Sequence, residues 1–437
     1  MRKNLFRLAV LAAMAVPFAG SAQQNQTDRE TYLRPSYWRP YDQRGINVFE
    51  TNKTPDSIPY DGLRIRFGAG FTQQFQKLSH STKSGQALYQ MGAGFDLAQA
   101  NLFTDVQLAD GIRLHLATYL SARHHNETWV KGGYIQFDKL PFKGQFWSDL
   151  MKITTVRIGH MEINYGDQHF RRVDGGQAMY NPFIENYIAD AFSTEIGGEV
   201  TLQKNGVFGL VGVTNGTINA SINKQGPDAE MDSTKNPALY FKAGIDKSLG
   251  NVRVRVTGSG YVNSKSQRNV LYGGDRTGSN YWAVMNPKGD DLVKNAFSGR
   301  FNPGFTRNIQ AFMFNGFVKA GGLELFGTVE KAKGNAATAT DLKKRNMSQN
   351  AIDVIYRFGA SENLFAGVRY NNVKAEMPGL TDEIKIDRTA FAAGWFLTKN
   401  VLLKGEYVKQ QYKNFAPTNI LYGGKFNGYV IEAVVGF

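Results

Sequence analysis

The feature that most constrains the fold is a regular alternation of apolar and polar residues along most of the chain. Side chains on a strand alternate between two faces. In the last segment, 428–437, one face is therefore apolar and consists of Tyr429, Ile431, Ala433, Val435 and Phe437. Strands in soluble sandwiches usually have about five to six residues, whereas a tilted strand needs roughly 9–11 residues to cross a bilayer. The alternating segments here repeatedly reach that length, so the pattern predicts an all-β chain whose strands cross a membrane.

Sixteen segments carry this pattern. They are 63–76, 88–108, 111–123, 129–140, 152–164, 194–204, 206–217, 237–248, 250–263, 308–320, 322–333, 348–359, 362–375, 385–397, 400–412 and 426–437. Short and long connections alternate between them, as expected for tight periplasmic turns and larger outer loops. The sequence therefore predicts a transmembrane antiparallel β-barrel of about 16 strands with both termini in the periplasm. One connection, 141–151, is longer than a periplasmic turn should be.

Three regions follow from the N-terminal sequence. Residues 1–22 have the pattern of a cleavable signal peptide, with early basic residues, an apolar run at 8–19 and small residues before the cut. That run is shorter than the roughly 20 residues of a transmembrane helix. Residues 23–61 are polar and proline-containing, and we expect a periplasmic extension that folds against or into the barrel mouth. Residues 62–437 form the predicted barrel.

The amino-acid composition restricts the kinds of molecule that the chain is expected to bind. The chain contains no cysteine, so no disulfide framework stabilises it. Its formal net charge is +14, and its basic residues are scattered rather than clustered. Scattered charge excludes nucleic acid as an expected partner and favours anionic or neutral hydrophilic solutes, or a lipopolysaccharide surface.

Two features resemble known families. The apolar last strand with its terminal Phe437 resembles the assembly signal of Gram-negative outer-membrane barrels. The chain, above all IGHMEINYGDQHFRR at 158–172 and YNPFIEN at 180–186, resembles the porins of Bacteroidetes-type bacteria, which are grouped near the phosphate-selective porins. The resemblance implies an outer-membrane homotrimer, assembled by the barrel-assembly machinery in lipid and lipopolysaccharide, through which small hydrophilic solutes diffuse passively.

The resemblance also implies a function for the third outer loop, 165–193, because such porins fold this loop into the lumen as the pore constriction. Its candidate constriction residues are Arg171, Arg172, Asp174, Glu185 and Asp190. Four apolar residues in the loop favour the inward position, since an exposed loop rarely carries them: Phe183, Ile184, Ile188 and Phe192. The alternative is a surface loop whose charges contact lipopolysaccharide.

The strand face opposite the lipid should line the pore. Its candidates are Arg64, Arg66, Arg113, His115, Lys242, Arg253, Arg255, Glu199 and Glu432. This mixed but slightly basic set predicts a mild preference for anions, phosphate among them. It lacks the dense arginine ladder expected of a dedicated phosphate channel.

One strand breaks the alternation. If Val156 and Ile158 face lipid, His160 and Glu162 would face it too, which is costly in the hydrocarbon zone. Burial at a subunit boundary would remove this cost, and so would a register change near Gly159.

Two further functions stay open. The barrel could be non-conducting, with a structural or adhesive role and a lumen plugged by 23–61. It could also be an outer-membrane barrel hydrolase, although no Gly-x-Ser-x-Gly elbow or His-x-x-x-His zinc spacing occurs. We therefore predict no catalytic residue, no metal site and no cofactor.

Overall fold

The structure is a computed structural model. It describes residues 38–50, 53, 60–122, 128–217, 237–264, 266, 268–274, 277–293 and 296–437. The predicted signal peptide and residues 23–37 of the predicted extension lie outside the described residues. So do residues 51–52 and 54–59 of that extension and the whole of the long connection at 218–236.

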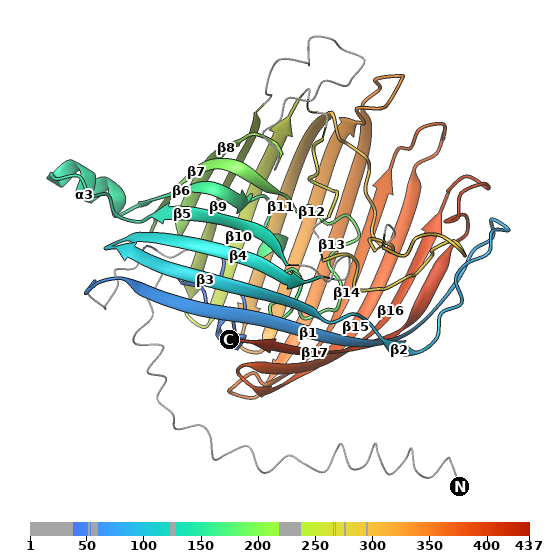
Figure 1. The fold of residues 1–437 in the computed structure, drawn as a ribbon, viewed down its shortest axis with the longest axis horizontal. Coiled ribbons are helices and arrows are strands. Elements are labelled where there is room, and N and C mark those ends of the chain that lie inside the picture. Colours follow the sequence, from blue (N-terminus) through green and yellow to red (C-terminus); the bar gives the residue numbers. More distant parts are fainter. Residues whose placement is uncertain are drawn as a thin grey trace, which may run out of the picture.

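Sixteen long antiparallel strands form a closed barrel (Figure 1), which confirms the predicted fold class. The strands are β1 (Arg64–Ser81), β3 (Gln99–Ala109), β4 (Ile112–Ser121), β5 (Trp129–Phe137), β6 (Thr154–Glu162), β7 (Thr194–Lys204), β8 (Val207–Thr214), β9 (Ala238–Leu249), β10 (Val252–Asn263), β11 (Asn308–Ala320), β12 (Leu323–Asn335), β13 (Arg345–Phe358), β14 (Leu364–Ala375), β15 (Ile384–Thr398), β16 (Val401–Lys413) and β17 (Lys425–Gly436). A two-residue strand, β2 (Gly94–Phe95), also pairs with β1.

The barrel closes at β1, which pairs with both the next long strand and the last one. Its first half pairs with β3, from Arg64 opposite Gln107, and its second half pairs with β17, ending at Ser81 opposite Lys425. At the seam, the backbones of Ala69 and Phe437 exchange two hydrogen bonds of 2.9 and 3.1 Å. Closure leaves no unpaired strand edge, which is what allows β-structure to exist in lipid.

The two faces of the wall differ as the alternation predicts. On β9, Leu239, Phe241 and Ile245 are exposed on the outside, whereas Tyr240 and Lys242 are buried inside. The same apolar outer face recurs on the other strands. No helix in the described part of the chain is both long enough and apolar enough to span a membrane.

Most predicted strand bounds agree with the structure to within a few residues, but two segments differ. The second long strand begins at Gln99 rather than at 88, and β1 extends to Ser81. The long connection at 141–151 contains a short helix, α3 (Gln145–Met151), which projects from the rim of the barrel (Figure 1).

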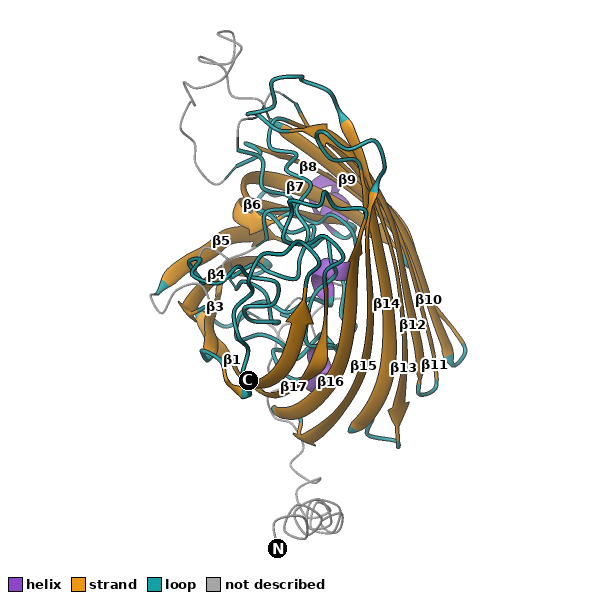
Figure 2. Cartoon of the chain, turned by 90° about the vertical axis from the view of Figure 1, so that its right-hand side faces the viewer, coloured by secondary structure: helices purple, strands orange, loops and turns teal. Residues whose placement is uncertain are grey.

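Loops and connecting segments of the chain occupy the interior of the barrel (Figure 2). Loop 165–193, with the 3-10 helix η3 (Gln168–Phe170), is buried almost throughout, and so are much of segment 38–50, with η2 (Gln43–Gly45), and much of the connection 264–307. Ile184 and Ile188 of the loop pack with inward-facing residues such as Tyr240 in one hydrophobic cluster. Much of the space inside the barrel is therefore occupied by packed side chains, whereas the lumen of a wide pore would be filled with water.

Candidate functional site

Inward-facing cations hold loop 165–193 in place. The Nζ of Lys404 on β16 donates to the carbonyls of Ala178, Asn181 and Phe183 at 2.9–3.1 Å and pairs with Glu432 at 2.7 Å. Arg369 on β14 pairs with Asp353 and donates to the carbonyl of Glu185 at 2.8 Å. These two wall cations thus donate to several backbone carbonyls of loop 165–193 and bond it to the inner face of the wall.

The predicted constriction residues lie in two different settings. Arg171 is buried and pairs with Glu324 at 2.7 Å, while Glu185 and Asp190 pair with Arg300 at 3.1 and 3.3 Å. These three residues lie inside the packed interior. Arg172, paired with Asp190 at 2.6 Å, and Asp174 line an open cavity. Arg172 and Asp174 thus border the wider space, whereas Arg171 and Asp190 border a small cavity of about 10 Å³.

Segment 38–50 lies inside the barrel near the short turns, where the backbone N–H of Gln43 donates to the carbonyl of Lys399. Asn47 donates to Glu324 at 2.7 Å, and Glu50 pairs with Lys242 at 2.9 Å and Arg255 at 2.6 Å. Burial alone would raise the pKa of the Glu50 carboxyl, but these two cations outweigh it and hold that pKa below its usual range. Segment 38–50 of the predicted extension is thus bonded into the lumen.

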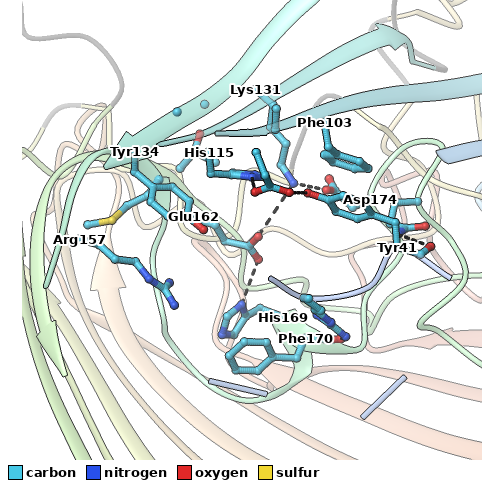
Figure 3. A pocket seen from close by; sticks show the side chains of 18 of the residues that line it. Tyr41, Phe103, His115, Lys131, Tyr134, Arg157, Glu162, His169, Phe170 and Asp174 are labelled. Atoms are coloured by element: carbon cyan, nitrogen blue, oxygen red, sulfur yellow. Dashed lines mark hydrogen bonds and ion pairs between the residues drawn. The ribbon is translucent and has the colours of Figure 1, made fainter. Parts of the chain in front are cut away.

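A cavity of about 230 Å³ remains between this filling and one side of the wall. Strands β1 and β3–β6 form its wall side, and segment 38–50 and loop 165–193 form the other (Figure 3). Six arginine and lysine residues line it, against three carboxylates: Arg39, Arg66, Arg113, Lys131, Arg157, Arg172, Asp105, Glu162 and Asp174. Six aromatic rings complete the lining, among them Tyr41, Phe103 and Tyr134. The space is therefore polar, aromatic and positively charged on balance.

Asp105 organises the wall side of this cavity. It accepts a hydrogen bond from Tyr41 at 2.7 Å, pairs with Arg66, and lies 2.9 Å from Nδ1 of His115. Arg113 approaches it to 3.9 Å. Two arginines, Arg66 and Arg113, thus share the single carboxylate of Asp105, so this cluster carries one positive charge in excess.

Lys131 reaches the cavity through an irregularity in β5. The pairing of β4 with β5 shifts between Ala117 and Thr118, which places one extra residue, Lys131, on the bulged strand. Val130 is exposed outside, and Lys131 points inward to Asp174 (Figure 3). Without the bulge, strict alternation with the outward Ile135 would turn Lys131 toward lipid.

The anomaly on β6 is resolved inside a single chain. Glu162 turns into the cavity, 3.3 Å from Nδ1 of His169 (Figure 3). His160 also lines the cavity. Gly159, with φ of +153°, has a conformation that side-chain-bearing residues rarely adopt. The pairing with β7 keeps its register through this point. The backbone at Gly159 changes direction without a slip, so Glu162 needs no subunit boundary to leave the lipid.

A second cavity, of about 590 Å³, lies at the short-turn end beside β7–β10. Five cations and two carboxylates line it: Lys53, Lys152, Lys204, Arg253, Arg255, Glu50 and Asp246. Glu50 and Arg255 are shared with the ion-pair network that holds segment 38–50. Both cavities therefore carry more positive than negative groups.

The nine predicted pore-lining residues all lie on the inner face, in different surroundings. Arg66, Arg113 and His115 line the first cavity, and Arg253 and Arg255 line the second. Lys242, Glu199 and Glu432 are buried in ion pairs, and Arg64 pairs with Asp61 at the rim. Sequence reasoning missed Asp105, although it alternates with outward positions on β3, and missed Lys131, which only the bulge turns inward.

Comparisons with known proteins point to the fold. No known protein-family model matches the chain, and no curated protein matches it by sequence. Among solved structures, it is similar to the anion-selective porin from Comamonas acidovorans, with 10% identity and a TM-score of 0.53, covering 86% of this chain and 100% of that one. It is also similar to OmpT, an outer membrane protein of Vibrio cholerae in trimer form, with 11% identity, a TM-score of 0.50 and the same coverage. The barrel and its apolar outer face place the chain in the outer membrane of a Gram-negative bacterium, with the fold of the porins.

Proposed function

We propose that the chain is an outer-membrane porin through which small hydrophilic solutes diffuse passively, with a mild preference for anions. The observation that carries the proposal is the pair of cavities beside the wall, one against β1 and β3–β6 and the other against β7–β10, each lined by more cations than carboxylates. Lining charge and pore width decide which ions pass a channel. A narrow, basic route between the wall and the filling would favour small anions, phosphate included. The resemblance to Bacteroidetes-type porins agrees with this role.

The proposed selectivity residues differ in part from those expected from the sequence. Arg172 and Asp174 remain candidates because they line the first cavity, whereas Arg171, Glu185 and Asp190 are held in buried ion pairs. The wall residues Arg66, Arg113, Lys131 and Arg157 take their place. Glutamates in place of Arg171 and Arg172 would thus disturb the docked loop as well as the pore charge.

Planar-bilayer recording tests the proposal. With the purified protein in a bilayer that separates two salt concentrations, the reversal potential should have the sign expected when anions cross more readily than cations. The double variant Arg113→Gln with Arg157→Gln should move it toward cation preference, because two cavity charges are lost. The matched control is Lys413→Gln, in an exposed ion pair with Asp387. Normal conductance with an unchanged reversal potential in the double variant would remove these residues from the solute path.

A second candidate function rests on the filled interior. A barrel closed by segment 38–50 and loop 165–193 would serve a structural or adhesive role without conducting. Correctly folded protein that gives no current steps in the bilayer would favour this candidate.

We also propose that the chain assembles as a homotrimer in lipid and lipopolysaccharide after insertion by the barrel-assembly machinery. The similar OmpT structure is a trimer form. Chemical cross-linking of the protein in native membranes should give a ladder that ends at three copies, and a ladder ending at one copy would contradict the trimer.

A further inference from the structure

The connection between β5 and β6 carries an exposed cluster of aromatic rings that the channel does not use. Phe142 and Phe146 are 58% and 68% exposed, and Trp147 is 37% exposed. The centroid of the Trp147 ring lies 5.2 Å from that of Phe142 and 5.2 Å from that of Phe146. Helix α3 projects from the rim rather than into the lumen (Figure 1). Exposed apolar patches of this kind mark contact surfaces.

Helix α3 is amphipathic despite its length. At 100° per residue, Phe146, Trp147 and Leu150 fall on one side of the helix. Gln145, Ser148 and Asp149 fall on the opposite side, where Gln145 and Lys152 both bond to Asp149. The helix therefore presents one apolar and one polar face, the arrangement of a segment lying in an interface.

Charge and position point to the occupant. Three lysines flank the cluster, Lys139, Lys143 and Lys152. Two of them form exposed ion pairs, Lys139 with Asp110 at 2.7 Å and Lys152 with Asp149 at 2.6 Å, so the cluster keeps one positive charge in excess. Lysine stems cover apolar surface while their ammonium groups reach phosphates. The apolar outer face of the barrel reaches this same rim on both sides of α3, through exposed Leu108 on β3 and Leu202 on β7. Tryptophan and other aromatic residues concentrate at membrane–water interfaces.

We propose that α3 and its flanking residues form a membrane-interface anchor, which inserts Phe142, Phe146 and Trp147 among phospholipid headgroups on the short-turn side of the barrel. Lys143 binds a lipid phosphate there, and Lys139 and Lys152 do so by exchanging their exposed partners Asp110 and Asp149 for phosphate. The anchor accounts for the one short-turn connection that is too long for a simple turn. It fixes the depth and tilt of the barrel at β5 and β6, the strands whose inner faces line the first cavity.

Site-directed spin labelling tests the anchor cleanly because the chain has no cysteine. Full-length Phe146→Cys and Gln145→Cys, neighbours on opposite faces of α3, are labelled and folded into phosphatidylcholine vesicles with or without phosphatidylglycerol. The label at 146 should be relaxed mainly by oxygen, which partitions into the bilayer, and the label at 145 mainly by a water-soluble nickel complex. Phosphatidylglycerol should strengthen the oxygen effect at 146.

Two outcomes would overturn the anchor. Nickel access at both positions would place α3 in water, and shielding of 146 from both reagents would place it against protein, such as a second copy. A further variant, Phe142→Ser with Trp147→Ser in the Phe146→Cys background, should shift the 146 label to nickel access. Its heat-dependent gel migration should stay normal, because no strand pairing is touched.

Discussion

At the scale of single residues, the interior is organised by cations that bond to the backbone of the filling. Lys404 is the clearest case, since one buried ammonium joins Glu432 and three loop carbonyls. Arg388 joins the same loop to the connection 264–307, because it donates to the carbonyls of Asn186 and Gly299 at 2.7 and 2.8 Å. Such groups belong to the wall but act on the loops, so wall substitutions should change the lumen without opening the barrel.

Lys404→Met should release loop 165–193. The change leaves Glu432 without its cation and three carbonyls without a donor, and breaking a buried pair costs about 3–5 kcal/mol. We expect a larger and noisier conductance together with new protease cleavage within 165–193. Lys413→Met is the control, since exposed pairs contribute about 0–1 kcal/mol. Equal behaviour of the two variants would show that Lys404 does not hold the loop.

Acid should undock the same loop. Burial would raise the pKa of the Glu185 carboxyl, but Arg300, Arg388 and backbone N–H groups outweigh it and hold that pKa below its usual range. The stabilisation is therefore present above the unfolded pKa, about 4.3, and is lost as the pH falls through the lower docked pKa. The part of the conductance change that depends on Glu185 should therefore appear below about pH 4.3. Glu185→Gln should reduce that change, and an acid transition of the same size in this variant would contradict the assignment.

At the scale of elements, segment 38–50 behaves as an internal part of the barrel rather than as an appendage. It contributes Tyr41 to the first cavity and Glu50 to the second, and it also bonds to the short turns. It therefore narrows the proposed solute route at two points.

Deleting residues 38–50 should raise the conductance and weaken anion selectivity. The two cavities would merge with the space that the segment leaves, and salt screens wall charges over about 8 Å near physiological ionic strength. Single-channel recording with the full-length protein as reference measures both effects. Unchanged conductance in a correctly folded variant would place the solute route away from the segment.

At the scale of the whole molecule, closure explains the expected resistance to denaturation. Every long strand is paired on both sides, and β1 pairs with β3 and β17. No strand can therefore leave the barrel without losing its backbone hydrogen bonds on both sides, so we expect the strands to unfold cooperatively.

The purified protein should therefore migrate faster on gels before heating than after heating. Its circular dichroism in detergent should be dominated by β-structure, because the described residues contain only one α-helix, of 7 residues. Mainly helical spectra, or migration unaffected by heat, would contradict the closed barrel.

The local periodicity of the sequence was enough to predict the strands of the barrel wall and the direction of their side chains. Alternation with a period of two requires only neighbouring residues, so the strands, the order of short and long connections and the inward face of Arg66, Lys242 or Glu199 could all be predicted. The boundary of β3 could not be, because residues 88–98 run partly beside β1 and the isolated bridge of Leu88 to Pro287 joins distant segments.

Tertiary structure alone decided what the interior contains. Arg171 and Arg172 are adjacent in the sequence, yet one pairs with Glu324 on β12 and the other borders a cavity, because loop 165–193 meets different strands at each position. Lys131 faces inward only through a one-residue bulge against β4. These outcomes depend on contacts between residues far apart in the chain. Such contacts form only if their packing outweighs the entropy lost in closing the loop between them, and neither quantity can be read from neighbouring residues in the sequence.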